Sequence, residues 1–264
     1  MPQEDRYRQV VESLLTFQTN KIFNMKKKNL STQYNNSAKN YEELHTGENK
    51  KSTGIFLNIV LRYIEKIQTI EHERSLVHLL DLGCGSGTDF ELYSKQRKVC
   101  CFGLDASQEM ISLVEEKFPK KIILECEDFS QKNIRPFKGF HFQLIVSKWA
   151  LQTAEDLSIV WENVDRLLVR DGYFIFLTVH PLRQFLEKKK SGKDYFKQEI
   201  VASEIFDKQI TVYEPTHTMQ DYLSPYFLEH FELLEIKEDY EFPAAEQIGG
   251  DIYPTHLIVV ARKK

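Results

Sequence analysis

Three glycines at alternate positions constrain this chain more than any other feature. Gly83, Gly85 and Gly87 stand in the stretch HLLDLGCGSGTD, residues 78–89, after an apolar strand-like segment and before a helix-like one. Glycine is needed where a chain turns sharply and a ligand touches its backbone, and N–H groups at a helix start are available to polar ligand atoms. The stretch therefore predicts a strand, a tight loop and a helix that bind a nucleotide-like cofactor.

Asp105 makes this prediction more specific. It lies 22 positions beyond Gly83, at the end of the next strand-like segment, FGLDAS. A carboxylate placed there can accept hydrogen bonds from both hydroxyls of a ribose. A glycine loop alone is often no more than a tight turn, but a loop with an acidic residue in register favours cofactor binding over that alternative.

The residues around the loop alternate between apolar strand patterns and amphipathic helix patterns. Strands are predicted at 77–82, 99–105, 122–126, 142–147 and 173–179, and helices at 53–70, 90–95, 108–118 and 157–168. This alternation implies right-handed βαβ crossovers and a parallel sheet in a doubly wound α/β core. The last two strands, in FELLEIKEDYEF and HLIVVARK, have no helix between them and are expected to pair antiparallel.

Two irregular regions flank this core. Residues 1–50 are polar and are interpreted as an N-terminal helical lid or cap. Residues from about 181 to 216 are charged and aromatic and are interpreted as a substrate-side insertion over the sheet edge, followed by a helix from Met219 to His230. A chain of 264 residues fits one α/β core, so residues 51–264 are expected to form a single domain.

Composition narrows the range of partners. A formal net charge of −4 provides no global positive field for phosphates, which disfavours nucleic acid. The charged start MPQEDRYRQVVE and the absence of a long apolar segment predict a cytoplasmic protein with no membrane partner. Cys84, Cys100, Cys101 and Cys126 form no Cys-x-x-Cys pair, so neither disulfides nor a metal site are expected. The four cysteines are interpreted as small buried hydrophobes.

The spacing of the loop separates two classes of cofactor. A dinucleotide fold has G-x-G-x-x-G, whereas this chain has G-x-G-x-G followed by Thr88 and Asp89, whose carboxylate would repel a pyrophosphate. With LDLGCGSG, and over roughly residues 76 to 180, the chain resembles class I S-adenosylmethionine (SAM)-dependent methyltransferases of the small-molecule branch. The resemblance implies a Rossmann-like, mostly parallel seven-stranded sheet with an antiparallel C-terminal strand. It also implies SAM as cofactor and S-adenosylhomocysteine (SAH) as product.

The resemblance assigns the methionine part of SAM to the first and fourth strands. In the family, the positions that match Asp81, Gly83, Cys84 and Gly85 hold this part of the cofactor. Asp81 would steer the ammonium group, directly or through water. The residue at Ser147 would offer its backbone carbonyl to the same ammonium.

The nucleoside part would be held by residues after the second and third strands, namely Asp105, Ala106, Ser107, Met110, Asp128 and Phe129. Asp105 would bind the ribose hydroxyls. Asp128 would accept from the exocyclic amine of adenine, and Phe129 would contribute its backbone N–H. The alternative for Asp128 and Phe129 is an ordinary surface turn, in which acidic residues are also frequent.

The chemistry of methyl transfer places modest demands on side chains. The reaction is an in-line displacement, so much of the catalysis can come from positioning, and a general base is optional. His180 lies at the C-terminal end of the fifth strand, the rim where ligands bind in open α/β sheets, and is the candidate base. The alternative is a histidine that caps the strand end. Lys148 departs from the family, because a cation beside a sulfonium is repelled unless its side chain points away.

The candidate substrate-binding residues are tyrosines, a tryptophan and histidines near the expected rim. They are Tyr34, Tyr41, Trp149, His180, Tyr195 and His217. Each of them could instead pack a cap against the core. The expected function is transfer of the SAM methyl group to an O or N atom of a small-molecule acceptor. The alternatives are a SAM- or SAH-binding protein without methyl transfer, and a methyltransferase that acts on protein or RNA. A nicotinamide-dependent oxidoreductase is disfavoured by the loop spacing.

Overall fold

The computed structural model describes residues 31–32, 34–35, 38, 50–70, 76–189, 193–205, 209–241 and 252–264. The main sheet consists of β1 (Val77–Leu82), β2 (Val99–Asp105), β3 (Ile123–Cys126), β4 (Phe142–Lys148), β5 (Leu168–Val179), β8 (Phe231–Asp239) and β9 (His256–Lys263). The helices are α3 (Lys50–Ile70), α4 (Phe90–Tyr93), α5 (Gln108–Lys117), α6 (Leu157–Leu167), α7 (Pro181–Arg183), α8 (Met219–Tyr222) and α9 (Pro225–His230). Two further turns are helical, the 3₁₀ turn η1 (Leu151–Thr153) and the π-helical turn η2 (Gln184–Lys188).

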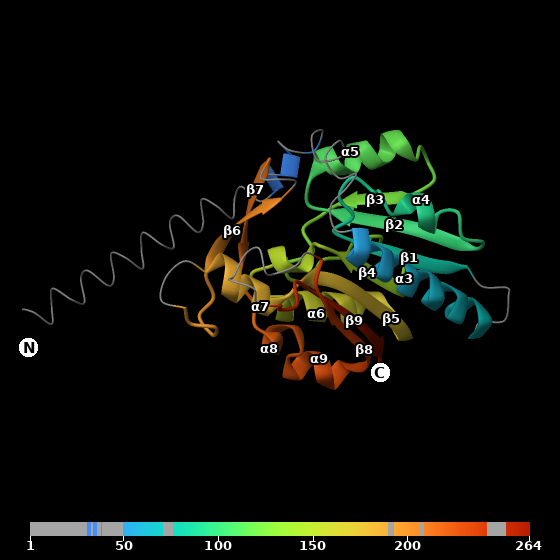
Figure 1. The fold of residues 1–264 in the computed structure, drawn as a ribbon. Helices are drawn as coiled ribbons and strands as arrows, with labels where there is room; N and C mark the ends of the chain where they lie inside the picture. The colour runs from blue at the N-terminus through green and yellow to red at the C-terminus, as the bar shows by residue number, and fades with distance from the viewer. Residues whose placement is uncertain are drawn as a thin grey trace, which may run out of the picture.

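The seven strands of the main sheet lie in the order β3-β2-β1-β4-β5-β9-β8 (Figure 1). The pairs β1–β2, β1–β4, β2–β3 and β4–β5 are parallel, whereas β9 runs antiparallel to both β5 and β8. The predicted fold class, a Rossmann-like, mostly parallel seven-stranded sheet with an antiparallel C-terminal strand, is confirmed. Because β1 and β4 are neighbours in the centre of the sheet, their carboxyl ends meet at one edge, where the glycine loop follows β1.

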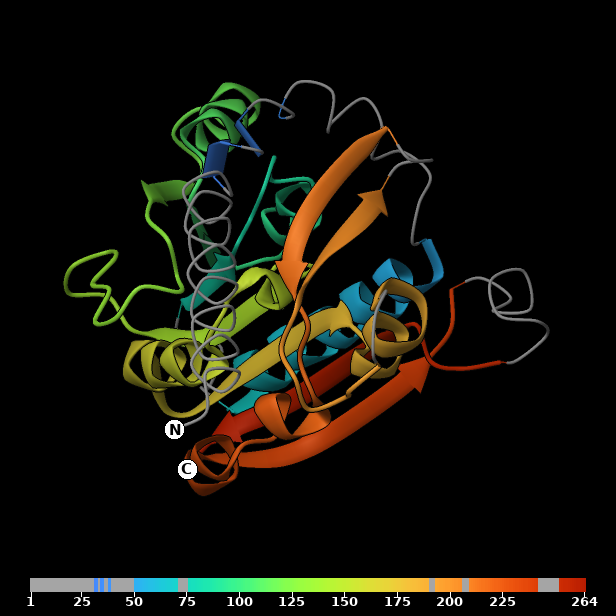
Figure 2. The same ribbon diagram turned by 90° about the vertical axis from the view of Figure 1, so that its left-hand side faces the viewer.

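Helices cover both faces of this sheet (Figure 1, Figure 2). On one face, α3 buries Phe56, Val60 and Ile64, which recur every four residues and therefore form one apolar stripe. On the other face, the Trp161 ring of α6 stacks on Phe176 of β5 with ring centroids 5.7 Å apart. Fully burying a side chain of this size stabilises the fold by roughly 1.5–3 kcal/mol. The two apolar layers hold the strand ends in fixed positions.

The segment after the core differs from the sequence prediction in one respect. A single helix was expected from Met219 to His230, but the structure has two, α8 and α9. The break comes at Pro225, which has no N–H for a continuing helix, and the Ser224 hydroxyl accepts from the Phe227 N–H as the cap of α9. The prediction of one continuous helix was wrong because this start signal was overlooked.

The insertion after β5 forms a hairpin of β6 (Ile200–Ile205) and β7 (Ile210–Pro215), which pair antiparallel as a separate two-stranded sheet. The hairpin is drawn in orange and lies apart from the main sheet, beside the short blue segment at residues 31–38 (Figure 1, Figure 2). Tyr34 packs against Ile210 and Val212 of this hairpin. Most of residues 1–50 lies outside the described residues, so the N-terminal lid stays a prediction.

The four cysteines are free, and their environments differ. Cys101 is buried, and burial raises the pKa of its thiol to about 12. Cys84 and Cys100 are half-buried, whereas Cys126 is exposed at the end of β3. The prediction of four buried hydrophobes is confirmed for Cys101, holds only in part for Cys84 and Cys100, and is wrong for Cys126, because β3 is the strand at the edge of the sheet.

Across the described ranges, no helix combines the length and the apolar character that crossing a bilayer requires. Within the same ranges, no group of three or more His, Cys, Asp or Glu side chains is arranged to hold a metal ion.

Candidate cofactor site at the carboxyl edge of the sheet

The glycine loop after β1 has a backbone that requires glycine. Gly83, Gly85 and Gly87 have φ values of 79°, 51° and 72°, in the left-handed region. At Gly83 a Cβ atom would lie 2.4 Å from the Cβ of Ala150, so a side chain there would collide with the segment after β4. The Gly83 and Cys84 N–H groups both donate to the Leu104 carbonyl, at 2.8 and 3.0 Å. These bonds tie the loop to the end of β2.

Asp105, the last residue of β2, is held by the backbone on both carboxylate oxygens. The Gly85 N–H donates to Oδ2 and the Ser107 N–H donates to Oδ1, each at 2.9 Å. Burial raises the pKa of Asp105 above its usual value, although the two N–H bonds oppose the rise. The carboxylate is thus fixed in orientation at the edge of the sheet.

A cavity opens at this edge. Its lining comes from the glycine loop, the ends of β2 and β4, the turn after β3 and the N-terminal segment: Ser31, Tyr34, Gly83, Gly85, Asp105, Ala106, Ser107, Met110, Asp128, Phe129, Lys148, Trp149, Ala150 and Thr153. A smaller recess adjoins it under the glycine loop, lined by Asp81, Gly83, Cys84, Gly85, Ser86, Thr88, Asp89, Lys148 and Trp149. Four residues line both spaces: Gly83, Gly85, Lys148 and Trp149.

The cavity and recess bring together most of the predicted cofactor residues, which come from three separate parts of the chain: Asp81, Gly83, Cys84, Gly85, Asp105, Ala106, Ser107, Met110, Asp128 and Phe129. Ser147 is not part of either lining. It is fully buried, and its hydroxyl donates to the Leu82 carbonyl at 2.8 Å. The individual roles of these residues toward SAM stay predictions.

Asp128 belongs to a surface turn and also lines the cavity. Its Oδ1 accepts from the N–H and the hydroxyl of Ser130, at 2.9 and 2.6 Å, and its Oδ2 accepts from Gln131 Nε2 at 2.9 Å. These bonds are those of the surface turn that was the alternative for this residue. Asp128 also lines the cavity, and each carboxylate oxygen has two acceptor sites. Turn formation and ligand binding are therefore compatible.

Lys148 and Asp89 form a buried ion pair in the recess that sequence reasoning missed. Lys148 Nζ lies 2.7 Å from Asp89 Oδ1, and the two side chains are 10% and 7% exposed. Asp81, in the same recess, is 4% exposed. Burial raises the pKa of Asp81 well above its usual value, the negative charge of Asp89 adds to the rise and Lys148 opposes it. The recess therefore has charged groups of both signs close together.

His180 lies away from both linings. Its ring is 4% exposed, Nδ1 accepts from the Leu182 N–H at 3.0 Å, and Nε2 lies 2.8 Å from Glu238 Oε1. Since Nδ1 accepts, Nε2 carries the proton and donates to the carboxylate. Both ring nitrogens are engaged, so the geometry favours the capping role over that of a general base.

The remaining predicted substrate residues are dispersed. Tyr34 and Trp149 line the cavity, and Tyr41 lies outside the described residues. The Tyr195 hydroxyl accepts from the Met219 N–H at 2.8 Å and belongs to the packing of the insertion. His217 is 3% exposed, and its Nε2 has no hydrogen-bond partner within the described part of the chain.

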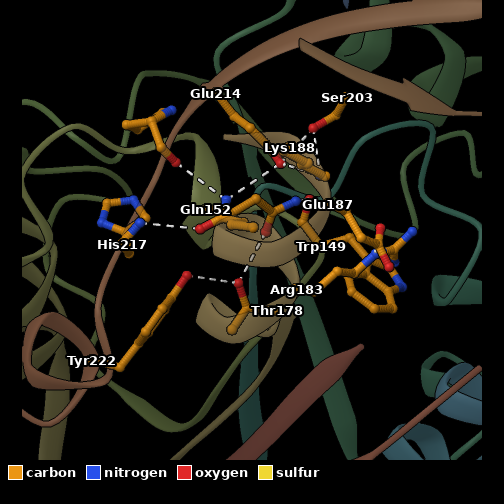
Figure 3. Close-up of polar contacts among 12 residues, drawn as sticks. Trp149, Gln152, Thr178, Arg183, Glu187, Lys188, Ser203, Glu214, His217 and Tyr222 are labelled. Carbon is orange, nitrogen blue, oxygen red and sulfur yellow. Dashed lines mark hydrogen bonds and ion pairs between the residues drawn. The ribbon is translucent and has the colours of Figure 1, made fainter. Parts of the chain in front are cut away.

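Buried polar groups of the sheet edge and of the insertion form two sets of contacts (Figure 3). The Thr178 hydroxyl donates to Gln152 Oε1 at 3.1 Å and lies 3.0 Å from the Tyr222 hydroxyl. On the insertion side, Lys188 Nζ lies 2.7 Å from Glu214 Oε1. The first two contacts join β5 to η1 and to α8, and the ion pair joins η2 to β7 of the hairpin.

Comparison with known proteins agrees with this geometry. Residues 80–176 match a family described as Methyltransferase domain. The structure is similar to an S-adenosylmethionine-dependent methyltransferase from Mesorhizobium loti, with a TM-score of 0.57 and 22% identity over 72% of this chain and 92% of that one. It is also similar to the DhpI-SAM-HEP complex, with a TM-score of 0.57 and 14% identity over 88% of this chain and 94% of that one.

Curated relatives match over shorter stretches. A malonyl-acyl-carrier protein O-methyltransferase from Halorhodospira halophila is 28% identical over 124 residues, which are 46% of this chain and 40% of that protein. Two other relatives are matched over 49% and 42% of their own lengths, so the chain spans about half, or less, of the curated relatives it matches. The sequence, the fold and the family match agree: residues 80–176 match a methyltransferase domain, and the fold is similar to that of SAM-dependent methyltransferases of known structure.

Proposed function

We propose that this protein transfers the methyl group of SAM to an O or N atom of a small-molecule acceptor. The observation that carries the proposal is the cavity at the carboxyl edge of β1, β2 and β4, in which a glycine loop faces a backbone-held Asp105. The lining fits the parts of SAM by its chemistry. Carboxylates suit the ribose hydroxyls and the ammonium, and the apolar Met110 and Phe129 suit the adenine ring.

When bound, SAM supplies a methyl group that its sulfonium makes reactive toward a nucleophile. The protein then contributes by orienting SAM and the acceptor and by excluding water from the site. Asp105 binds ribose hydroxyls, Asp81 binds the ammonium, and the tight approach of Gly83 to Ala150 keeps the loop close to the ligand. Because the reaction is an in-line displacement, we assign the rate to positioning and assign no general base.

The acceptor side of the cavity lies toward the N-terminal segment and η1. Tyr34, Trp149 and Thr153 line it, and Tyr34 also contacts the β6–β7 hairpin. We assign residues 1–50 to the lid and residues 51–264 to the methyltransferase domain, with the insertion at about 181–216 on the acceptor side. Ser31 and Tyr34 of the N-terminal segment line the cavity, and a lid there suits an acceptor small enough to be enclosed.

The first experiment is calorimetric titration with SAM and SAH, with NADH as the control ligand. Binding of both adenosyl ligands and no binding of NADH is expected. Absence of SAM and SAH binding would overturn the proposal, because every later step depends on the cofactor.

The second experiment follows methyl-labelled SAM in a cell extract separated into small molecules, protein and RNA. Label is expected in the small-molecule fraction, and the amount of SAH formed should equal the amount of methyl label transferred. Label in protein or RNA would establish the macromolecular alternative. Binding without any SAH formation would establish a SAM-binding protein without methyl transfer.

One relative supports a specific second candidate. The Halorhodospira halophila protein is by its name an O-methyltransferase for a malonyl group carried on a protein. A carboxylate acceptor of that kind would have to enter a cavity lined by Asp105 and Asp128, beside a recess lined by Asp81 and Asp89, with Lys148 as the cation among the described lining residues. This charge balance favours a neutral or basic acceptor. Labelled transfer to a malonyl-acyl-carrier protein would decide for the second candidate.

A further inference from the structure

The recess under the glycine loop has an unusual distribution of charge. Across the described lining of the cavity and the recess, the acids are Asp81, Asp89, Asp105 and Asp128, and the cation is Lys148. Lys148 lines both spaces and lies at the boundary between them. Among the described side chains of this lining, Lys148 is therefore the one whose charge attracts a negative ligand group.

The fold fixes Lys148 beside Asp81. Asp81 is in β1, where it pairs in register with Val146 of the neighbouring parallel strand β4. Lys148 is the last residue of β4, two positions beyond Val146. Asp81 and Lys148 therefore emerge at the same edge of the sheet, and both line the recess. Lys148 also opposes the rise in the pKa of Asp81, as a cation close to a carboxyl does.

Asp89 fixes the other end of the lysine side chain. It precedes α4, in the turn after the glycine loop, and its Oδ1 lies 2.7 Å from Lys148 Nζ. The Lys148 ammonium has three N–H donors, and this contact uses one of them. A buried ion pair contributes little net stability, because the loss of hydration of both charges offsets their attraction. Stability alone therefore does not explain a charged pair in the wall of this recess.

We propose that Lys148 binds the α-carboxylate of the methionine part of SAM, and that Asp89 positions Lys148 for this contact. An α-amino acid carries its ammonium and its carboxylate on one carbon, so their binding groups must be neighbours in the site. Asp81 and Lys148 are such neighbours. The inference rests on the proposed roles of Asp81 and of the recess. It gives Lys148, which departs from the family pattern, a role in the cofactor site.

The test compares two ligands that differ in the carboxylate. SAM and decarboxylated SAM both carry the adenosyl group, the sulfonium and the ammonium, but decarboxylated SAM has no carboxylate. Calorimetry gives the ratio of their Kd values for the wild type, Lys148→Met and Lys148→Arg. The wild type is expected to prefer SAM. Lys148→Met is expected to weaken SAM binding by about tenfold or more, which is the size of a charge-assisted hydrogen bond, and not to weaken binding of decarboxylated SAM.

Further variants separate binding from structure. Lys148→Arg keeps the cation and is expected to keep most of the preference for SAM. Asp89→Asn is expected to reduce the preference by less than Lys148→Met, because the ammonium remains but is no longer held. Lys95→Met removes a matched lysine from an exposed pair with Glu91, at 2.9 Å, and is expected to leave both affinities unchanged.

The double variant Lys148→Met with Asp89→Asn guards against a single variant that does not fold. It removes both charges of the ion pair together, so neither partner of that pair is left alone, and it is still expected to lose the preference for SAM. An unchanged Kd ratio in Lys148→Met and in the double variant would overturn the inference while leaving the cofactor in place. Binding of neither ligand by the wild type would overturn the cofactor site itself, and the inference with it.

Discussion

The Gly85 N–H donates to Oδ2 of Asp105 at 2.9 Å, which makes the glycine loop and the end of β2 a single unit. The Ser107 N–H occupies Oδ1 in the same way, also at 2.9 Å. Each carboxylate oxygen has more than one acceptor site, so a carboxylate that backbone N–H groups hold in place can also accept from a ligand. A fixed carboxylate of this kind suits the hydroxyls of a ribose.

Replacing Asp105 with alanine should therefore reduce cofactor affinity. We expect the Kd for SAH to rise by a factor of about 30, equivalent to about 2 kcal/mol, because charge-assisted hydrogen bonds to the ligand are lost. The Gly85 and Ser107 N–H groups would also lose their acceptor, at a cost of about 1–3 kcal/mol in the free energy of unfolding. Calorimetry measures the first effect and denaturant unfolding the second.

Asp156→Ala is a matched control for this variant. Asp156 also accepts a backbone N–H, from Ser158 at 2.9 Å, but it caps α6 on the surface and does not line the cavity. Its loss should cost about 1 kcal/mol of stability and leave the Kd for SAH unchanged. Wild-type affinity in a folded Asp105→Ala protein would refute the ribose assignment.

Gly83→Ala should damage both stability and binding. Its φ of 79° disfavours any side chain, and the new Cβ would lie 2.4 Å from the Cβ of Ala150, an atom that cannot rotate away. The left-handed backbone costs about 1–2 kcal/mol and the overlap about 1–3 kcal/mol, so the unfolding free energy should fall by about 3 kcal/mol. The loop must shift to relieve the overlap, and the Kd for SAH should rise accordingly.

Gly139→Ala isolates the backbone part of that effect. Gly139 has a φ of 93°, but an added Cβ would meet no atom within 4 Å, and the residue is not in the lining of the cavity. A loss of about 1 kcal/mol in stability with unchanged SAH affinity is expected from thermal unfolding and calorimetry. Equal effects of the two substitutions would show that the close approach of Gly83 to Ala150 has no role.

The sequence predicts the edge of the sheet well because its signals there are local. Glycine spacing, an apolar strand and an acid after the next strand all lie within 78–105, and strand alternation then determines which edge they share. The antiparallel pairing of β8 and β9 could also be predicted from the sequence, since no helix separates the two strands. The start of a new helix at Pro225 could also be predicted, because proline is typical of the first position of a helix.

Side-chain direction is what the sequence could not supply. The sequence shows Lys148 as a departure from the family, because a cation beside a sulfonium is repelled, and its partner Asp89 lies 59 positions earlier in the chain. His180 was placed correctly at the end of β5, but its contact with Glu238 spans 58 positions. Both contacts depend on which way a side chain points at the end of a strand, and that is decided by packing across the sheet.

His180→Asn distinguishes the capping role from the catalytic role. Asparagine is also a good helix N-cap, so it can accept from the Leu182 N–H in place of Nδ1. If capping is the role of His180, the variant should keep SAH affinity and turnover close to wild type at pH 8. A general base would instead contribute a factor of about 100 or more, and turnover would fall by that factor in a folded protein.

The same variant has a predicted pH dependence. Burial lowers the pKa of His180 below its ordinary value of 6.5, and the bond to Glu238 opposes this only in part. Below pH 6.5 the unfolded chain therefore binds more protons at this residue than the folded protein, and stability falls as the pH falls. Wild type should lose more unfolding free energy than His180→Asn between pH 7 and pH 5. Parallel losses in the two proteins would contradict a buried neutral ring.

Lys188→Met tests whether the insertion can be weakened without loss of cofactor binding. Lys188 Nζ lies 2.7 Å from Glu214 Oε1, the side chains are 12% and 3% exposed, and the Ser203 hydroxyl donates to the same oxygen at 2.6 Å (Figure 3). Burial alone would raise the pKa of Glu214, but Lys188 and the hydrogen bonds outweigh it, so the pKa is lowered. Without the lysine a buried carboxylate is unpaired, and the unfolding free energy should fall by about 3–5 kcal/mol.

The pH dependence of that loss follows from the same pair. In wild type the lowered pKa of Glu214 gives stability that is present above pH 4.5 and lost as the pH falls through the folded pKa. In Lys188→Met the carboxyl gains by protonation, so the difference in unfolding free energy between the two proteins should shrink as the pH falls from 7 to 5. Lys188→Met with Glu214→Gln should recover much of the loss, because no unpaired charge remains. Since neither residue lines the cavity, the Kd for SAH should stay at the wild-type value in all three proteins, and a change in it would mean that the insertion and the cofactor site are coupled.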